Sequence, residues 1–493
     1  MSMTRSTIGE LSDFVQHKPS IILGNKFFDS RCVLQVDVAH KADKFEPRIF
    51  VISKFRIFFL IGKTTSSLKI EKSFHVLTIR SIHLVKEDEI SISIDDGVHK
   101  RKINIKCSDS KRSYAALCDL YEQPYREEVS WDVEKIYTAN RLHDLKIDDF
   151  SHLLPRDLLP IVGVLQYSSY FTGLICDAIR IPSDVIDVIL NVIRKSHNLH
   201  KLQLRACALP KDFITLLSSS IHHNPNISLE ILDLSKNALD DKKGFTAFSS
   251  ILPRLTQLKS INLAECQLSD KCLNLLCSGL YNGMTACKSG GMQLAELNLA
   301  GNLVKDDISS IINLLSICTS LRILDLSETG IQLDKIWNSL KYGGIQIEKL
   351  ILSGCNLSKK SDGIQTAKEY FSMALNLQHI SFNNTSMPSE YLKAVLLGLA
   401  ANQQVYSSSQ YITVSISIDN NHIGTAWMYF DLATSMKINH TLTYLPYPVL
   451  DAFETIQFEP KDRELFWHEQ IQKIVCIEDR MAKSKKCRGG ESD

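Results

Sequence analysis

The chain of 493 residues has a net charge of +1, an apolar content of 44% and a charged content of 23%. This length exceeds one ordinary hydrophobic core, so two or more folded units are expected. The near-neutral net charge argues against a protein that binds nucleic acid over its whole surface. The charge is uneven, because residues 26–112 carry 18 Lys and Arg against 11 Asp and Glu, whereas residues 113–493 carry 36 against 42. The sequence therefore predicts a basic module ahead of a mildly acidic body.

The start of the chain and its cysteines predict a cytosolic protein. Residues 1–20 lack the apolar core of a secretory signal. No apolar run approaches the ~18 residues that a membrane span requires. The 13 cysteines follow no paired spacing, so reduced thiols are expected.

Residues 1–125 have the pattern of a small antiparallel sheet. Their apolar or alternating runs are Cys32–Val38, Ile49–Ile52, Phe55–Ile61, Phe74–Ile82, Ile90–Ile94 and Ile103–Lys106. A helical stretch follows, in which Tyr114, Leu117 and Cys118 recur on one face. Several antiparallel strands closed by one C-terminal helix predict a β-rich, pleckstrin-homology-like domain.

The segment IGKTTS at 61–66 has some of the letters of a phosphate-binding loop. Such a loop needs a glycine five residues before Gly62 so that its backbone amides can surround phosphate, and that position is Ile57. The preceding residues continue as a strand into the segment. A hairpin turn is therefore predicted.

Residues 126–198 are predicted to link this module to the rest of the chain and to form an N-terminal cap on the repeats that follow. They combine helical patterns over 157–167 and 182–196 with a short strand-like segment over 142–147. A cap is expected here because the residues that follow form repeats, and a terminal repeat needs a polar outer face.

Residues 199–450 repeat the pattern L-x-x-L-x-L-x-x-N/C-x-L, which is typical of leucine-rich repeats. Residues 229–239, LEILDLSKNAL, fit this pattern at every position. The frame recurs from Leu199, Leu258, Leu294, Leu321, Ile347 and Leu377, and a last copy ends in Ile416, Ile418, Asn421 and Ile423. Roughly 26–36 residues separate the starts, which leaves room for a helix after each strand. The predicted fold is an α/β leucine-rich-repeat solenoid, ribonuclease-inhibitor-like, with a strand plus a helix per repeat.

The ninth position of the repeat has a structural interpretation. Asn237, Asn302 and Asn421 are expected to form hydrogen bonds with backbone groups in the turn after each strand. Cysteine or threonine fills the same position in the other copies, at Cys207, Cys266, Cys355, Thr329 and Thr385. These cysteines are therefore interpreted as structural rather than as metal ligands or redox groups.

The end of the chain is predicted to close the solenoid. Residues 451–482 place Trp467, Ile471, Ile474 and Val475 on one helical face, which predicts a C-terminal helical cap. Residues 483–493 are polar and are expected to form a disordered tail.

Several segments resemble the CARMIL family, which links actin capping protein, the Arp complex and myosin I. The most specific are YREEVSWDVEKIY (125–137) and DDFSHLLPRDLLPIVGVLQYSSYFTGL (148–174). KSFHVLTIRSI (72–82) resembles a strand pair in the family's pleckstrin-homology domain. LKAVLLGLAANQ (392–403) and LTYLPYPVLDAF (442–453) resemble the family's later repeats and repeat cap. The resemblance implies a membrane-associated scaffold that regulates actin assembly, located in the cytoplasm, on the cytoskeleton and at the inner face of the plasma membrane.

The sequence departs from the family in two ways. The family's solenoid is longer, and here the copy from Leu377 is soon followed by segments that resemble the end of the array. Family members also continue into a dimerisation region and a disordered tail with the basic motif that binds capping protein. This sequence ends at Asp493 without that motif, so capping-protein binding is not carried over from the resemblance.

The basic module is the predicted membrane-binding site. Its candidate lipid-binding residues are Lys41, Lys44, Arg48, Lys54, Arg56, Lys63, Lys100, Arg101 and Lys102. Anionic headgroups attract such clusters, at roughly 1 kcal/mol per basic residue near the surface. The alternative is a solvated basic surface without a membrane role.

The strands of the solenoid provide a second candidate surface on their concave side. One row of variable positions reads Gln203, Asp233, Asn262, Asn298 and Asp325, and then Ile351 and Ser381. Its polar, partly acidic character suits a protein-binding face, and it suits plain solvent equally well.

The sequence predicts no catalytic residues, cofactor, nucleic-acid partner or small-molecule substrate. The spacings of His197 with His200, of His222 with His223 and of Cys272 with Cys277 lack the second half of a metal site. Two non-enzymatic functions remain, a membrane-associated actin scaffold and a generic cytosolic leucine-rich-repeat interaction module.

Overall fold

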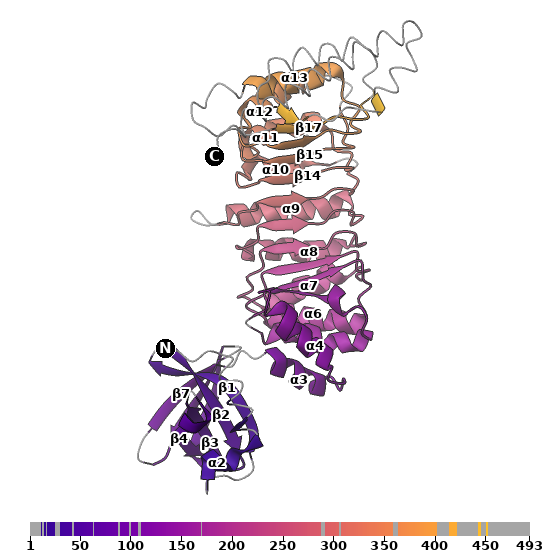
Figure 1. Cartoon of the computed structure of the whole chain (residues 1–493). Coiled ribbons are helices and arrows are strands. Elements are labelled where there is room, and N and C mark those ends of the chain that lie inside the picture. The colour runs from indigo at the N-terminus through magenta and orange to yellow at the C-terminus, as the bar shows by residue number, and fades with distance from the viewer. Residues whose placement is uncertain are drawn as a thin grey trace, which may run out of the picture. The chain divides into compact units, whose positions relative to one another are not determined.

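The computed structural model describes residues 11–451 with gaps, of which 402–413 and 422–441 are the longest. The chain divides into two compact units. The first comprises Met1–Leu145, His152–Thr172 and Asp184–Val192, and the second comprises Lys146–Ser151, Gly173–Ser183 and Ile193–Asp493. The first contains an antiparallel sheet and a group of short helices, and the second contains the repeats (Figure 1).

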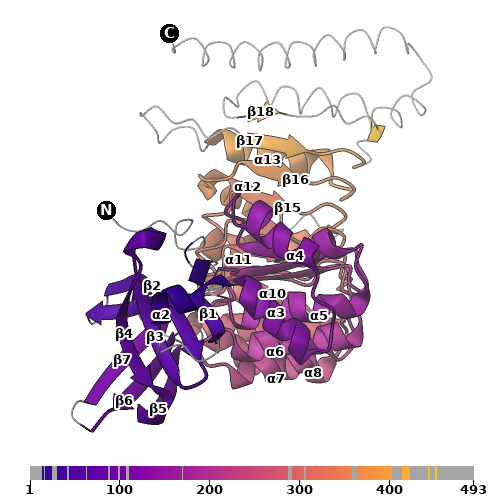
Figure 2. The same cartoon turned by 60° about the horizontal axis from the view of Figure 1, so that its bottom comes forward.

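The first unit contains a seven-stranded sheet (Figure 2). This sheet and the N-terminal residues that pack on it are here called the sheet module. Its strands are β1 (Ser30–Lys41), β2 (Lys44–Ser53), β3 (Arg56–Ile61), β4 (Lys69–His75), β5 (Ile79–Lys86), β6 (Glu89–Asp95) and β7 (Lys100–Lys106). Their order is β4-β3-β2-β1-β7-β6-β5, and all neighbours are antiparallel. The predicted β-rich N-terminal module is confirmed.

The run Phe74–Ile82 is divided between two strands, as the resemblance of residues 72–82 to a strand pair implies. β4 ends at His75, β5 begins at Ile79, and the 3-10 turn η3 (Val76–Thr78) separates them. β4 pairs with β3, whereas β5 pairs with β6, so the break carries the chain from one edge of the sheet to the other. Apolar residues recur on both sides of the break, so hydrophobicity alone does not show where the chain changes direction.

The predicted hairpin turn at 61–66 is confirmed. It connects the antiparallel strands β3 and β4, and a short 3-10 turn, Thr65–Ser67, forms part of it. A Cβ on Gly62 would lie 2.5 Å from the Cα of Leu68, so a larger residue there would force the turn open.

Two apolar clusters fill the sheet module. The first joins Leu11, Val15 and Leu23 of the N-terminal segment, which includes α2 (Pro19–Leu23), to Val51 and Phe58 of the strands. The second lies among β1, β2, β3, β6 and β7, where the rings of Phe50 and Phe59 are 5.1 Å apart. An N-terminal segment therefore completes the first core.

The helix predicted after the strands is present as α3 (Ser110–Leu120), and its predicted face is buried. It contacts α5 (Leu158–Gly163) and the following 3-10 turn η7 (Val164–Gln166). A Cβ on Gly163 would lie 3.4 Å from Leu117, which shows how closely the two helices approach. Its buried side chains belong to neither of the two clusters of the sheet.

The predicted elements between the sheet and the repeats are also present. α4 (Glu127–Asp132) continues directly into the π-helical turn η4 (Val133–Tyr137). The short strand β8 (Asp144–Lys146), helix α5 and helix α6 (Ser183–Lys195) fall within the segments predicted for them.

The second unit is a solenoid of parallel strands and helices. Its strands are β9 (Gly173–Asp177), β10 (Lys201–Arg205), β11 (Ile231–Asp233), β12 (Ser260–Asn262), β13 (Glu296–Asn298), β14 (Ile323–Asp325), β15 (Lys349–Ile351), β16 (His379–Ser381), β17 (Val414–Ser417) and β18 (Leu442–Tyr444). Its helices are α7 (Phe213–His223), α8 (Lys242–Ile251), α9 (Asp270–Thr285), α10 (Ser309–Ile317), α11 (Trp337–Gly343), α12 (Ile364–Met373) and α13 (Ser389–Ala401). They alternate along the chain and stack in order, as Figure 1 shows for the helices. The leucine-rich-repeat prediction is confirmed.

One repeat strand was not predicted. β9 pairs with β10 over five residues, from Gly173 with Lys201 to Asp177 with Arg205. Its frame replaces two key positions, with Phe171 where the first leucine belongs and Ile179 where asparagine or cysteine belongs. The array therefore begins before Leu199.

The ninth-position prediction is confirmed in detail. The Asn302 Oδ1 accepts hydrogen bonds from the backbone N–H groups of Cys266 (3.1 Å) and Leu268 (3.0 Å) in the preceding repeat. The Asn302 amide donates to the carbonyls of Leu263 (2.7 Å) and Leu299 (2.9 Å). Asn237 and Asn421 make corresponding contacts. Each asparagine thus joins two successive turns.

The predicted C-terminal cap lies outside the described residues. The residues predicted to form its apolar face, Trp467, Ile471, Ile474 and Val475, and the predicted tail 483–493 also lie outside the described residues.

Candidate functional site

The basic residues of the sheet module separate into two groups along β2. Lys41 and Lys44 end β1 and begin β2, whereas Lys54 follows the last residue of β2 and Arg56 begins β3. β2 has ten residues, which span about 30 Å at the usual rise of a strand. The spacing Lys41 with Lys54-Phe55-Arg56 therefore does not form one compact basic cluster.

The β1–β2 turn lies near the start of β7. β1 pairs with β7 at Asp37 with Lys106 and at Val38 with Ile105, so the two strands run antiparallel from there toward Lys41 and Lys102. Lys100, Arg101 and Lys102 are all exposed on β7. The structure thus places these three residues beside the turn between Lys41 and Lys44. Lys100, Arg101 and Lys102 are here called the β7 basic rim. Lys63 lies outside the described residues.

Arg48 does not belong to an exposed basic surface. Its side chain is only 6% exposed, and its guanidinium donates to both carboxylate oxygens of Glu71 (2.7 and 3.0 Å) and to Glu46 (3.1 Å). The hydrogen bonds that Arg48 donates to Glu71 raise the pKa of Arg48 above its ordinary value. Its donors are used inside the protein, so Arg48 is removed from the candidate lipid-binding set.

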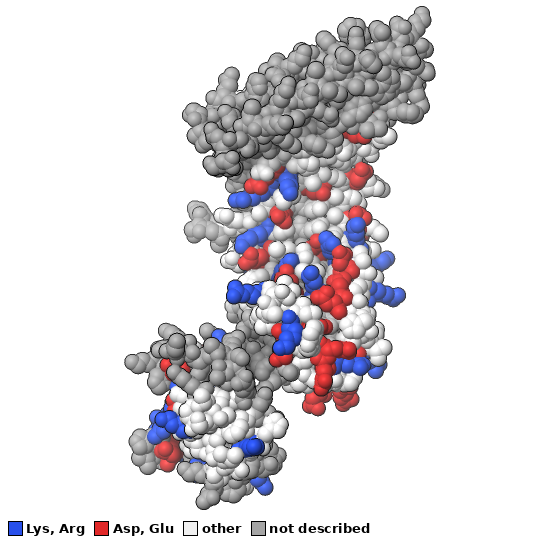
Figure 3. Space-filling view, in the orientation of Figure 1, with Lys and Arg blue, Asp and Glu red and all other residues white. Residues whose placement is uncertain are grey.

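Charged side chains on the sheet module are sparse in the view of Figure 3. A few Lys, Arg, Asp and Glu side chains lie around an uncharged area of this module, and positive and negative side chains are more numerous on the solenoid. Exposed apolar side chains of the module include Phe55 (40% exposed) and Leu77 (83%).

The predicted concave row is present as one register line across the sheet. Gln203, Asp233, Asn262, Asn298 and Asp325 are paired in succession from β10 to β14. The same line continues through Ile351 and Ser381. Neighbouring strands are about 4.8 Å apart, so these side chains form a continuous strip.

Four residues of this row also stabilise the turns that follow their strands. The Oδ1 atoms of Asp233, Asn262, Asn298 and Asp325 each accept from the backbone N–H two residues later, at 3.0–3.1 Å. Asn262 donates from its amide to Asp233 Oδ2 at 3.0 Å, and Asp233 is only 5% exposed. These turn contacts give a structural reason for the polar residue at each of these four positions.

A row of charged pairs borders the concave strip. Glu230 accepts from Lys259 at 2.6 Å and lies 3.4 Å from His200 Nδ1, and Arg322 lies 3.5 Å from Glu348. The hydrogen bond from Lys259 lowers the pKa of Glu230. These side chains join successive repeats along the edge of the sheet.

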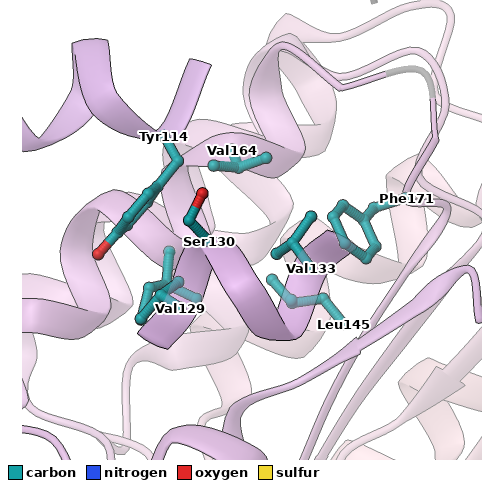
Figure 4. Close-up of a pocket in the computed structure, with 8 residues that line it drawn as sticks. Tyr114, Val129, Ser130, Val133, Leu145, Val164 and Phe171 are labelled. Carbon is teal, nitrogen blue, oxygen red and sulfur yellow. The ribbon is translucent and has the colours of Figure 1, made fainter. Parts of the chain in front are cut away.

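An apolar crevice lies among the short helices of the first unit (Figure 4). It is lined by Tyr114, Val129, Ser130, Val133, Leu145, Ile161, Val164 and Phe171. The hydroxyls of Tyr114 and Ser130 are buried here, and burial raises the pKa of Tyr114. The space offers little more room than a water molecule needs, so it provides no small-molecule site.

Eight of the nine cysteines that the structure describes are buried. Cys272 and Cys277 are buried on α9, and burial raises the pKa of each thiol to about 12. Within the described part of the chain, no three His, Cys, Asp or Glu side chains are grouped to hold a metal ion. No helix among these residues has the length and apolarity needed to cross a membrane.

This fold and its surfaces define a class of protein, a leucine-rich-repeat solenoid preceded by a pleckstrin-homology-type sheet. The family description "CARMIL family, LRR domain" matches residues 107–412, more than half of the chain. "Carmil pleckstrin homology domain" matches residues 30–117. The chain belongs to the CARMIL family.

The relatives are longer proteins. "Capping protein, Arp2/3 and myosin-I linker protein 3" of Homo sapiens is 27% identical over 455 residues, which cover 79% of this chain and 33% of the relative. "Protein CARMIL" of Dictyostelium discoideum is 23% identical over 454 residues, which cover 81% of this chain and 42% of the relative. "Rho GTPase-activating protein gacW" of the same organism is 21% identical, over 76% of this chain and 37% of its own length. The chain thus spans a third to two fifths of these relatives.

Proposed function

We propose that the chain is a non-enzymatic scaffold that docks on anionic membrane through the β7 basic rim and holds a protein partner of the actin cytoskeleton on its solenoid. Three successive exposed cations, Lys100, Arg101 and Lys102, lie beside the β1–β2 turn of a sheet that matches the Carmil pleckstrin homology domain. This juxtaposition is the main support for membrane docking, because clustered cations attract anionic headgroups at roughly 1 kcal/mol each. The proposed location is the cytoplasm and the inner face of the plasma membrane.

The actin role rests on family membership and on the concave strip. The printed names of two relatives refer to capping protein, Arp2/3 and myosin-I or to CARMIL itself. The concave strip from Gln203 to Asp325 is the surface on which we expect the partner, since solenoids present variable strand positions there. The proposal assigns no capping-protein binding to this chain.

The test is co-sedimentation of the full chain with vesicles of phosphatidylcholine, with and without phosphatidylserine, at two salt concentrations. The variant Lys100→Glu/Arg101→Glu/Lys102→Glu is expected to bind anionic vesicles about 100-fold more weakly, from roughly 1 kcal/mol lost per cation. A matched control reverses three exposed lysines of the solenoid, Lys211→Glu/Lys242→Glu/Lys243→Glu, and so changes the net charge equally.

Binding that requires phosphatidylserine, falls with salt and is lost only in the first variant supports the proposal. Equal losses in both variants would show that total charge, not the rim, drives binding. No binding of the wild-type chain at low salt would leave a generic leucine-rich-repeat interaction module without a membrane role.

A further inference from the structure

Two turns of the sheet module meet at one corner. The β2–β3 turn contains Lys54 and Phe55, and η3 follows β4. The backbone N–H of Val76 donates to the Phe55 carbonyl at 2.9 Å, and Arg56 pairs with His75. The rings of Phe55 and His75 are nearly parallel, with centroids 6.4 Å apart. The two turns therefore form one local structure, here called the Phe55–Leu77 corner.

The corner holds an apolar side chain in solvent. Leu77 is 83% exposed, although two hydrogen bonds define the turn that carries it. Its backbone N–H donates to His75 Nδ1 at 3.2 Å, and the Thr78 hydroxyl donates to the His75 carbonyl at 2.7 Å. Phe55 adds a second apolar group, 40% exposed. Single exposed apolar residues are common, but here two lie together on an ordered turn.

The charges around the corner are of one sign. The segments 53–56 and 72–81 contain Lys54, Arg56, Lys72 and Arg80 and no Asp or Glu. The ammonium of Lys54 lies 5.4 Å from the centre of the Phe55 ring, and Arg80 is 68% exposed. The carboxylate of Asp95 on β6 is 3.7 Å from Arg80, a weak exposed pair. An apolar tip surrounded by cations matches the interface of an anionic bilayer, where apolar groups enter the acyl boundary and cations meet phosphates.

The corner lies beside the β7 basic rim. Ile79, the first residue of β5, pairs with Ile94, and Ile94 pairs with Arg101. The start of β5 is therefore two strands from Arg101, a distance of about 10 Å. Arg101 of the rim therefore lies near the corner, whereas Lys41 and Lys44 lie at the far end of β2, about 30 Å from Lys54.

We propose that the Phe55–Leu77 corner inserts into the interfacial layer of an anionic phospholipid bilayer. Leu77 and Phe55 enter the headgroup and acyl boundary, and Lys54 and Arg80 contact lipid phosphates. This inference rests on the proposed membrane docking and adds an apolar component to it. Charge attraction weakens with salt, whereas burial of Leu77 does not, so the two components are separable.

The test is partition of the full chain onto phosphatidylcholine and phosphatidylserine vesicles over a series of salt concentrations. Leu77→Ser is expected to weaken binding roughly tenfold at every salt concentration, because the variant no longer transfers a leucine side chain from water into the bilayer. The slope of log affinity against log salt should stay as in the wild type. Lys100→Glu/Arg101→Glu/Lys102→Glu should instead reduce that slope.

The matched control is Ile21→Ser. Ile21 is 66% exposed on α2, and its neighbour Ile22 packs against the first apolar cluster. Leu68 and Ile70 pack against the same cluster at the start of β4, whereas the corner lies at the end of β4. This variant should bind as the wild type does. A second variant, Leu77→Trp, should keep its affinity and gain fluorescence that brominated acyl chains quench, whereas Ile21→Trp should not.

The outcomes separate the two proposals. Wild-type binding with no effect of Leu77→Ser, and no quenching of Leu77→Trp, would overturn insertion and leave docking by charge alone. No binding of the wild-type chain would overturn both. Loss of binding in Ile21→Ser equal to that in Leu77→Ser would also overturn the specific role of the corner.

Discussion

Replacement of Asn302 by alanine tests how the solenoid is held together. Asn302 is completely buried and contacts backbone groups of two successive repeats. In Asn302→Ala, the N–H groups of Cys266 and Leu268 lose their acceptor, and the carbonyls of Leu263 and Leu299 lose a donor. Each buried polar group without a partner costs about 1–3 kcal/mol, and carbonyls lie at the low end of that range.

The expected loss in the free energy of unfolding is therefore about 3–5 kcal/mol, reduced from the simple sum because the polar side chain is also removed from the core. The assay is chemical unfolding followed by far-ultraviolet circular dichroism, combined with hydrogen exchange. The Cys266 and Leu268 amides should lose protection first, because their acceptor is gone.

A matched control is Asn356→Ala. Asn356 also donates to a backbone carbonyl, that of Gly330 at 3.1 Å, but at an exposed site. This variant should lose less than about 0.5 kcal/mol. A loss below about 1 kcal/mol in Asn302→Ala, with unchanged protection of the two amides, would refute the reasoning.

Three further predictions concern packing, charge and pH. Gly343→Ala should destabilise the solenoid by about 3 kcal/mol or more in the same assay, since the new Cβ would lie 1.9 Å from the Leu315 carbonyl oxygen. Gly163→Ala should destabilise the protein less, because its new Cβ would lie 3.3–3.5 Å from side-chain atoms. Arg48→Met should lower the melting temperature without changing the salt slope of vesicle binding, because it removes the two hydrogen bonds that Arg48 donates to the half-buried Glu71. A changed slope with normal stability would return Arg48 to the lipid surface. Burial raises the pKa of Cys318 and Cys355 from 9.0 to about 11, so the folded state favours the protonated thiols. Their contribution to stability is present below pH 9 and is lost as the pH rises from 9 through about 11; thiol labelling of the native chain at pH 8 as fast as in denaturant would contradict this.

The repeats could be predicted from the sequence because the leucines that define the repeat pattern are the residues buried in the core. Leu229, Leu232, Leu234 and Leu239 are each at most 1% exposed, so the leucine frame and the core are the same residues. The register of the concave row followed from the same frame. β9 was missed because Phe171, although buried, and Ile179 break the letter pattern.

The functional surfaces were less predictable because they depend on contacts between distant residues. Arg48 and Glu71 are 23 positions apart, and the sequence gives no sign that one neutralises the other. The Phe55–Leu77 corner was hidden within the apolar run at 74–82, because its exposure follows from the turn at Val76–Thr78. The Asx-type hydrogen bonds of Asp233 and Asp325 likewise required the geometry of each turn.

The most direct test of the central claim is imaging of the fluorescently tagged full chain in cells, together with labelled actin and a plasma-membrane marker. We predict enrichment at actin-rich plasma membrane that is lost in Lys100→Glu/Arg101→Glu/Lys102→Glu and retained in Lys211→Glu/Lys242→Glu/Lys243→Glu. A wild-type chain distributed evenly through the cytoplasm, without enrichment at the membrane or with actin, would contradict a membrane-docked actin scaffold.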